Sequence, residues 1–129
     1  MQTTKGHPYL SQIGQIAINV KDLARATAFY RDTLGMKLLF EFPGLAFFDA
    51  AGVRLMLSRA EDPRFDHPAS ILYYKIADIG ETHRALESAG VEVAEVPHLI
   101  AQMPDHDLWI GSYLDSEGNT FALMSEVPR

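Results

Sequence analysis

The side chains best suited to bind a metal or transfer a proton are five histidines, because imidazole is both a common metal ligand and a versatile acid or base. His98 and His106 flank residues 99–105, where a hairpin would bring the two imidazoles close together. With Asp105 or Asp107 they would form a metal site. In a regular strand, however, both aspartates point to the face opposite His106, so three ligands would not converge easily. Loop histidines that bind no metal are the alternative interpretation.

Other catalytic chemistries have little support in this sequence. There is no cysteine, which excludes a thiolate nucleophile, a disulfide and a cysteine metal site. The sequence also has no nucleophile elbow, no phosphate-binding glycine loop and no histidine-rich helix pair. Covalent catalysis is therefore not predicted.

The chain contains two related halves. Residues 16–23 (IAINVKDL) correspond to residues 72–79 (LYYKIADI), and each run ends with aspartate and an apolar residue. Further along, residues 47–57 align with residues 113–123, where Asp-x-x-Gly or a similar turn separates two apolar stretches. A sequence that repeats in this way predicts two similar structural units.

The first half predicts a βαβββ unit. Residues 15–20 alternate between polar and apolar, as a strand does. Asp22 is placed to cap a helix, whose apolar residues recur at helical spacing until Gly35 supplies a left-handed exit. Three short runs of aromatic and branched residues then predict strands, at residues 37–42, 45–49 and 53–59.

The second half repeats the pattern. Residues 60–70 are polar and contain two prolines, which indicates a linker. A strand is predicted at residues 71–76, and a helix is capped by Asp78 and ended by Gly90. Three more strands are predicted at residues 91–100, 108–114 and 120–124.

Composition excludes several classes of partner. The chain has 129 residues, 47% of them hydrophobic and 22% charged, which is typical of one globular domain. Its net charge of −6 provides no basic surface for nucleic acid or anionic membrane. Residues 1–9 are polar and contain no signal-like apolar run, so the expected location is the cytoplasm.

Three motifs give the chain a family resemblance: residues 19–23 (NVKDL), 29–35 (FYRDTLG) and 113–119 (YLDSEGN). With them the sequence resembles the vicinal oxygen chelate superfamily of glyoxalase I, bleomycin-resistance proteins, fosfomycin-resistance proteins and extradiol dioxygenases. The resemblance implies an α+β fold in which two βαβββ modules form a cup-shaped mixed sheet with the helices outside. A single such domain would comprise module 1 (12–59), the linker (60–70) and module 2 (71–127), and a homodimer is the expected assembly.

The resemblance also implies where a metal would bind, since enzymes of the superfamily take ligands from the first and last strands of each module. Those positions correspond to Gln15 and Met56 in the first module and to Ile71 and Ala122 in the second. An amide, a thioether and two hydrocarbons are not a ligand set for a divalent ion. No metal cofactor is therefore predicted at this position.

Strand alternation then predicts which side chains would line the cup. Arg54 and Lys75 would favour a carboxylate or another anion, unless both cations extend into solvent at the rim. Tyr73 could donate a hydrogen bond, although a tyrosine that satisfies its own hydroxyl is the alternative, and Trp109 could be pocket wall, interface or core. The expected ligand-binding residues are Gln15, Asn19, Arg54, Met56, Tyr73, Lys75, Trp109 and Ala122.

Three hypotheses on function follow. The first is a metal-independent protein that binds a small organic molecule in the cup, where the two cations named above would suit an anion. The second is a glyoxalase-like lyase or a dioxygenase-like enzyme with a divalent metal in a rearranged site, for which His98 and His106 are the candidate ligands. The third is a dimeric interaction module whose cup is filled by its own side chains. The two modules would pair either within one chain or across a dimer.

Overall fold

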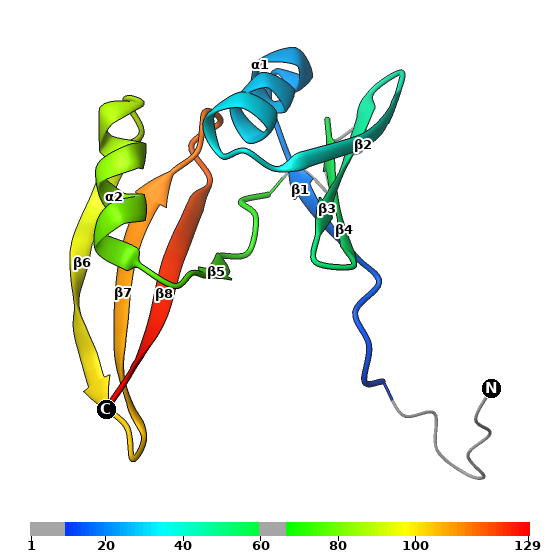
Figure 1. Cartoon of the computed structure of the whole chain (residues 1–129). Helices are drawn as coiled ribbons and strands as arrows, with labels where there is room; N and C mark the ends of the chain where they lie inside the picture. Colours follow the sequence, from blue (N-terminus) through cyan, green and yellow to red (C-terminus); the bar gives the residue numbers. More distant parts are fainter. Residues whose placement is uncertain (1–9, 60–66) are drawn as a thin grey trace, which may run out of the picture.

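The computed structural model describes residues 10–59 and 67–129, which form two four-stranded sheets with one helical segment each (Figure 1). The first module consists of β1 (Gln15–Asn19), α1 (Leu23–Ala28), the π-helical turn η1 (Phe29–Thr33), β2 (Lys37–Phe42), β3 (Leu45–Ala50) and β4 (Val53–Ser58). The second consists of β5 (Leu72–Lys75), α2 (Ile79–Ser88), β6 (Glu92–Gln102), β7 (His106–Leu114) and β8 (Thr120–Pro128). The predicted βαβββ repeat is confirmed. The predicted linker lies mostly outside the described residues, as do residues 1–9.

The two sheets have the same topology, and their parallel strand pairs have the same register. Their strand orders are β1-β4-β3-β2 and β5-β8-β7-β6. In each sheet the first strand runs parallel to the last, so that Ala17 lies beside Met56 and Tyr73 lies beside Ala122. The other strand pairs are antiparallel. The parallel pairs therefore reproduce the internal alignment of the sequence residue for residue. The antiparallel pair β7–β8 is offset by one residue from β3–β4, because Met56 lies opposite Phe47 whereas Ala122 lies opposite Ser112.

Both helices begin and end at the residues that the sequence indicates. The Asp22 carboxylate accepts the amide of Arg25 at 3.0 Å, and Asp78 accepts the amide of Glu81 at the same distance. After the helical segments, Gly35 and Gly90 adopt φ values of 70° and 85°, which a residue with a Cβ adopts only with strain. Within the described residues, no helix has the length and apolarity that crossing a bilayer requires.

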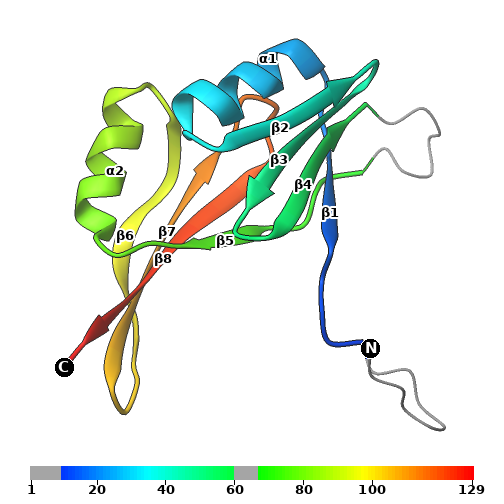
Figure 2. The ribbon, with the colours of Figure 1, turned by 45° about the vertical axis from the view of Figure 1, so that its right-hand side comes forward.

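Each helix covers one face of its sheet, which we call the helix face. The opposite face is not covered by a helix, and we call it the open face. The helix face of the first module contributes Ile18, Phe48, Leu55 and Leu57 to a buried core with Tyr30. A second core lies under α2 and contains Leu86, Tyr113, Phe121 and Leu123. In Figures 1 and 2 the two helices lie near each other on the same side of the molecule, whereas the β6–β7 hairpin extends away from them.

The β7–β8 turn, residues 115–119, joins the two modules by contacting α1 and η1 (Figure 2). Tyr30, which is 1% exposed, donates its hydroxyl hydrogen to Asp115 at 2.6 Å. Burial and the neighbouring Asp115 carboxylate raise the pKa of Tyr30, so the phenol remains a donor at every physiological pH. The amides of Glu117 and Asn119 both donate to the other oxygen of Asp115 at 2.8 Å. A buried aspartate is thus held by hydrogen bonds from both modules.

Replacement of Tyr30 with phenylalanine is expected to lower the free energy of unfolding by about 2 kcal/mol, because one oxygen of a buried carboxylate loses its shortest hydrogen bond. Urea unfolding at pH 7 measures the effect. The matched control is Tyr73→Phe, since Tyr73 is 53% exposed and its hydroxyl is expected to contribute little. Equal stabilities of the two variants would contradict the role given to the Tyr30 hydroxyl.

Candidate functional site

The open face of the first module brings together four of the predicted ligand-binding residues. Gln15 and Asn19 project from β1, and Arg54 and Met56 project from the adjacent strand β4. The Gln15 side-chain amide donates to the Met56 sulfur at 3.7 Å, which is a weak interaction that a ligand can replace. The Asn19 amide donates to the carbonyl oxygen of His67 at 3.0 Å. Gln15, Arg54 and Met56 are thus the members of this group that face outward with adaptable contacts.

Three phenylalanines form an aromatic patch beside this group. Phe40 and Phe42 on β2 lie opposite Phe47 and Leu45 on β3, and Phe47 in turn lies opposite Met56. The ring centroids of Phe40 and Phe47 are 4.7 Å apart, and those of Phe40 and Phe42 are 5.5 Å apart. The sequence analysis missed this patch. Its signal was the i, i+2 spacing of Phe40 and Phe42, which places both rings on one face of a strand.

Arg54 covers one end of the aromatic patch. Its guanidinium carbon lies 5.9 Å from the centre of the Phe47 ring, within the range of a cation–π contact. Within the part of the chain that the structure describes, Arg54 has no ion-pair partner. The carboxylate of Asp49, which lies opposite Arg54 on β3, accepts the amide of Gly52 at 3.0 Å. A planar anion that lies on the phenylalanines would therefore meet a guanidinium that is not held in an ion pair.

The open face of the second module holds three more of the predicted residues, Tyr73, Lys75 and Ala122. Tyr73 is exposed, whereas Ala122 is buried between neighbouring strands. The Lys75 ammonium forms an ion pair with Glu126 at 2.9 Å, and this hydrogen bond lowers the pKa of the Glu126 carboxyl. The charge of Lys75 is therefore already matched, which leaves Arg54 as the better anion-binding candidate of the two.

Trp109 lies apart from the other predicted residues. In β7 it is paired with Ser125, and its ring packs against the core under α2. Its neighbour Ile110 is the residue that projects from the open face, opposite Met124. Strand alternation thus places Trp109 on the helix face, where its contact is with the protein core.

The structure separates the two candidate histidine ligands. His98 lies opposite Ile110 and contacts the carbonyl oxygen of Val96 at 3.0 Å, while His106 starts the other strand of the hairpin. His106 contacts Asp105 at 2.7 Å and lies 3.9 Å from Glu126. The expectation that Asp105 points away from His106 is wrong, because Asp105 lies in the turn before β7 and is not bound by strand alternation. Among residues 10–59 and 67–129, no group of three or more histidines and carboxylates could hold a metal ion.

The four positions that correspond to the superfamily's metal ligands have equivalent geometry in the two modules. Gln15 precedes the Ala17–Met56 pair by two residues, as Ile71 precedes the Tyr73–Ala122 pair. Only Gln15 among the four carries an oxygen donor, and a single amide does not bind a divalent ion.

Comparisons with known proteins agree with this fold. The family model described as the Glyoxalase/Bleomycin resistance protein/Dioxygenase superfamily matches residues 12–123. With most of its length matched, the chain belongs to this superfamily. A search of curated proteins found no match.

Several solved structures share the fold. An antibiotic-binding protein, TnmS3, from Streptomyces sp. CB03234 has 24% sequence identity and a TM-score of 0.73, with 93% of this chain and 99% of that chain covered. A lactoylglutathione lyase from Agrobacterium tumefaciens has 22% identity and a TM-score of 0.70, covering 89% and 93%. A glyoxalase/bleomycin resistance protein/dioxygenase from Nocardioides has 20% identity and a TM-score of 0.72, covering 95% and 87%. Because these proteins include both binders and an enzyme, the similarity defines the fold, and the function has to be argued from the site.

Proposed function

We propose that this protein binds a small, planar organic anion on the open face of its first module without using a metal ion. The observation that carries the proposal is the aromatic patch with Arg54 over Phe47, next to ligand positions that hold Gln15 and Met56. Aromatic rings provide a stacking surface for a planar ligand, and a guanidinium provides a paired hydrogen-bond donor for a carboxylate. The similarity to an antibiotic-binding protein supports binding as the function. The cytoplasm is the location that we expect for the protein.

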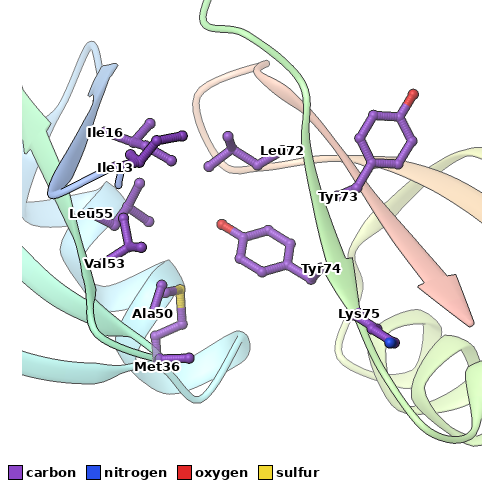
Figure 3. Close-up of a pocket in the computed structure, with 11 residues that line it drawn as sticks. Ile13, Ile16, Met36, Ala50, Val53, Leu55, Leu72, Tyr73, Tyr74 and Lys75 are labelled. Carbon is purple, nitrogen blue, oxygen red and sulfur yellow. The ribbon is translucent and has the colours of Figure 1, made fainter. Parts of the chain in front are cut away.

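We further propose that the binding site is completed by a second copy of the chain. Both open faces carry exposed apolar side chains: Phe42 is 57% exposed on the first, and Tyr73 and Ile71 are 53% and 48% exposed on the second. Exposed apolar surface of this kind favours association. The Tyr73 side chain points away from the gap between the modules and from the first-module residues on its far side (Figure 3). A homodimer that apposes the first open face of one copy to the second open face of its partner would cover both surfaces and enclose the ligand.

Binding of 2-naphthoate, a planar aromatic carboxylate, tests the proposed ligand class. We expect saturable binding by isothermal titration calorimetry, unchanged by EDTA. Arg54→Gln should weaken it about tenfold, as expected for loss of a charge-assisted hydrogen bond at a partly exposed site. Naphthalene-2-carboxamide, which has the same shape without the charge, should bind the variant and the wild type equally.

Arg31→Gln is the matched control, because Arg31 is an exposed arginine that pairs with Asp32 on η1. Its affinity for 2-naphthoate should equal that of the wild type. A stoichiometric divalent ion in protein purified without chelator, lost on replacement of both His98 and His106 with alanine, would contradict the proposal and support the metal-dependent enzyme instead.

A further inference from the structure

A separate apolar pocket lies between the two modules, on their helix faces. It has a volume of about 480 Å³, which is large enough for a small organic molecule. One wall comes from the first module and the other from β5 (Figure 3). Among the residues that line it are Ile16, Met36, Val53, Leu55, Leu72 and Tyr74, and the β5 residues Tyr73 and Lys75 lie at its margin. Strand alternation directs the side chains of Ile16, Leu55 and Tyr74 opposite to those of Gln15, Met56 and Tyr73, so the interior of this pocket lies on the other side of the strands from the open-face site. Tyr73 and Lys75 border both.

The pocket exists because β1 and β5 are both edge strands. Each is hydrogen-bonded on one side only, β1 to β4 and β5 to β8. The two edge strands therefore do not join the sheets into one continuous sheet. The modules are held together elsewhere, by the contacts of residues 115–119 with the first module. Apolar side chains such as Leu72 extend from β5 toward β1 across the space between the edges (Figure 3).

Tyr74 introduces a single polar group into these apolar surroundings. Its hydroxyl oxygen is buried and has no hydrogen-bond partner among the residues that the structure describes. The phenol points from β5 toward Val53 and Leu55 on the facing wall (Figure 3). Burial, and to a lesser extent the Asp115 carboxylate, raises the pKa of Tyr74 to about 12. The hydroxyl therefore remains protonated at neutral pH. Because its oxygen has almost no accessible surface, a ligand accepts its hydrogen only after a small shift of the phenol toward the cavity.

A buried hydroxyl without a partner is unfavourable, and an acceptor from a ligand would remove that cost. The surroundings also define the charge of the ligand. Lys75 is the one charged residue of the pocket margin among the described lining residues; it points away from the cavity (Figure 3) and is paired with Glu126. No cation is thus directed into the pocket to bind an anion.

We propose that the pocket between the modules is a second binding site, which takes a neutral, largely apolar molecule with one acceptor oxygen directed at the Tyr74 hydroxyl. A bicyclic ketone matches this description in size and polarity. The ligand would contact both modules at once, with Leu55 on one side and Leu72 on the other.

Titration with 1-tetralone and with tetralin, which lacks the carbonyl group, tests this proposal. We expect 1-tetralone to shift the methyl resonances of Leu55 and Leu72 in NMR spectra of the full chain. Tyr74→Phe should weaken 1-tetralone binding about threefold to tenfold, the effect of one neutral hydrogen bond, while tetralin affinity stays the same. Tyr73→Phe is the matched control: Tyr73 also borders the pocket, but its hydroxyl points away from the cavity (Figure 3), so removing that hydroxyl should leave both affinities unchanged.

The Tyr74→Phe variant is expected to fold normally, since its missing hydroxyl has no partner in the free protein. A blocking variant, Ala50→Phe, places a ring at the pocket wall and should abolish binding of both probes. Equal 1-tetralone affinity of the wild type and Tyr74→Phe, or absence of shifts at Leu55 and Leu72, would overturn the proposal. Retention of binding by a folded Ala50→Phe variant would do so as well.

Discussion

Replacement of Glu117 with glutamine is expected to lower the free energy of unfolding by about 3 kcal/mol at pH 7. The Glu117 side chain is completely buried, whereas its partner Arg25 is 53% exposed. Burial by itself raises the pKa of Glu117, but hydrogen bonds from Arg25, the amide of Asp22, Ser116 and the amide of Lys21 outweigh it and lower the pKa to about 2. Glutamine keeps the shape of the side chain and removes the charge that these donors stabilise.

The geometry explains why one carboxylate has so large an effect. The Arg25 guanidinium donates to both oxygens of Glu117, at 2.8 and 3.0 Å, and the amides of Lys21 and Asp22 donate at 2.9 and 2.8 Å. These donors belong to the first module and Glu117 to the second. Loss of the charge therefore weakens the local turn and also the contact between the two modules.

The effect of Glu117→Gln should depend on pH in a defined direction. The folded-state pKa of about 2 lies below the unfolded value of 4.5, so the carboxylate stabilises the folded state fully above pH 4.5 and progressively less as the pH falls toward 2. The stability difference between wild type and variant should accordingly shrink to about half by pH 3. Urea unfolding at pH 7, 5 and 3 measures this trend.

Asp32→Asn is the matched control, because Asp32 forms an ion pair with Arg31 at the same 2.8 Å but both side chains are exposed. Its replacement should change stability little at any of these pH values, since exposed ion pairs contribute little. A Glu117→Gln variant that behaves like Asp32→Asn would contradict the role of the buried pair.

Much of the fold could be predicted because its signals are local. Asp22 and Asp78 cap helices through contacts only three residues away, and Gly35 and Gly90 supply positive φ angles within single residues. Where the prediction stopped early, at the end of β8, the missing information was long-range: His106 pairs with Pro128 and extends both strands. Strand pairing over such a separation leaves no local pattern in the sequence.

The candidate site was only partly predictable for the same reason. Alternation along β1 and β4 correctly grouped Gln15, Arg54 and Met56 on one face. The aromatic patch depends on the register of β2 against β3, which is shifted by an irregularity between Leu38 and Phe40. Glu117 was recognised only as part of a turn, because its contact with Arg25 spans 92 residues. Alternation along a strand indicates which residues lie on the same face of a sheet. Which faces contact each other depends on how the modules pack, and that has no local signal in the sequence.

A zinc site built at equivalent positions of the two modules would show whether the open faces meet within one chain or across a dimer. A variant with Gln15→His, Met56→Glu, Ile71→His and Ala122→Glu should bind zinc with submicromolar affinity, because structural zinc sites with four protein ligands bind the ion with about 10 kcal/mol or more. The Gln15 and Met56 side chains already touch, so a histidine and a glutamate at these positions can reach one ion. Zinc titration in competition with a chromophoric chelator measures the affinity.

Two half-site variants separate pairing within a chain from pairing across a dimer. Gln15→His with Met56→Glu, and Ile71→His with Ala122→Glu, each supply two ligands per chain and should bind zinc at least about 100-fold more weakly than the four-ligand variant. If the open faces meet across a dimer, refolding the two half-site proteins together creates heterodimers in which one site has all four ligands, and tight binding returns at up to one zinc per heterodimer. If the faces meet within one chain, every site in the mixture still has two ligands and the mixture binds no better than its components. Tight binding by the four-ligand variant without recovery in the mixture would therefore refute the proposed dimeric site, because the same four side chains would have converged without a second copy.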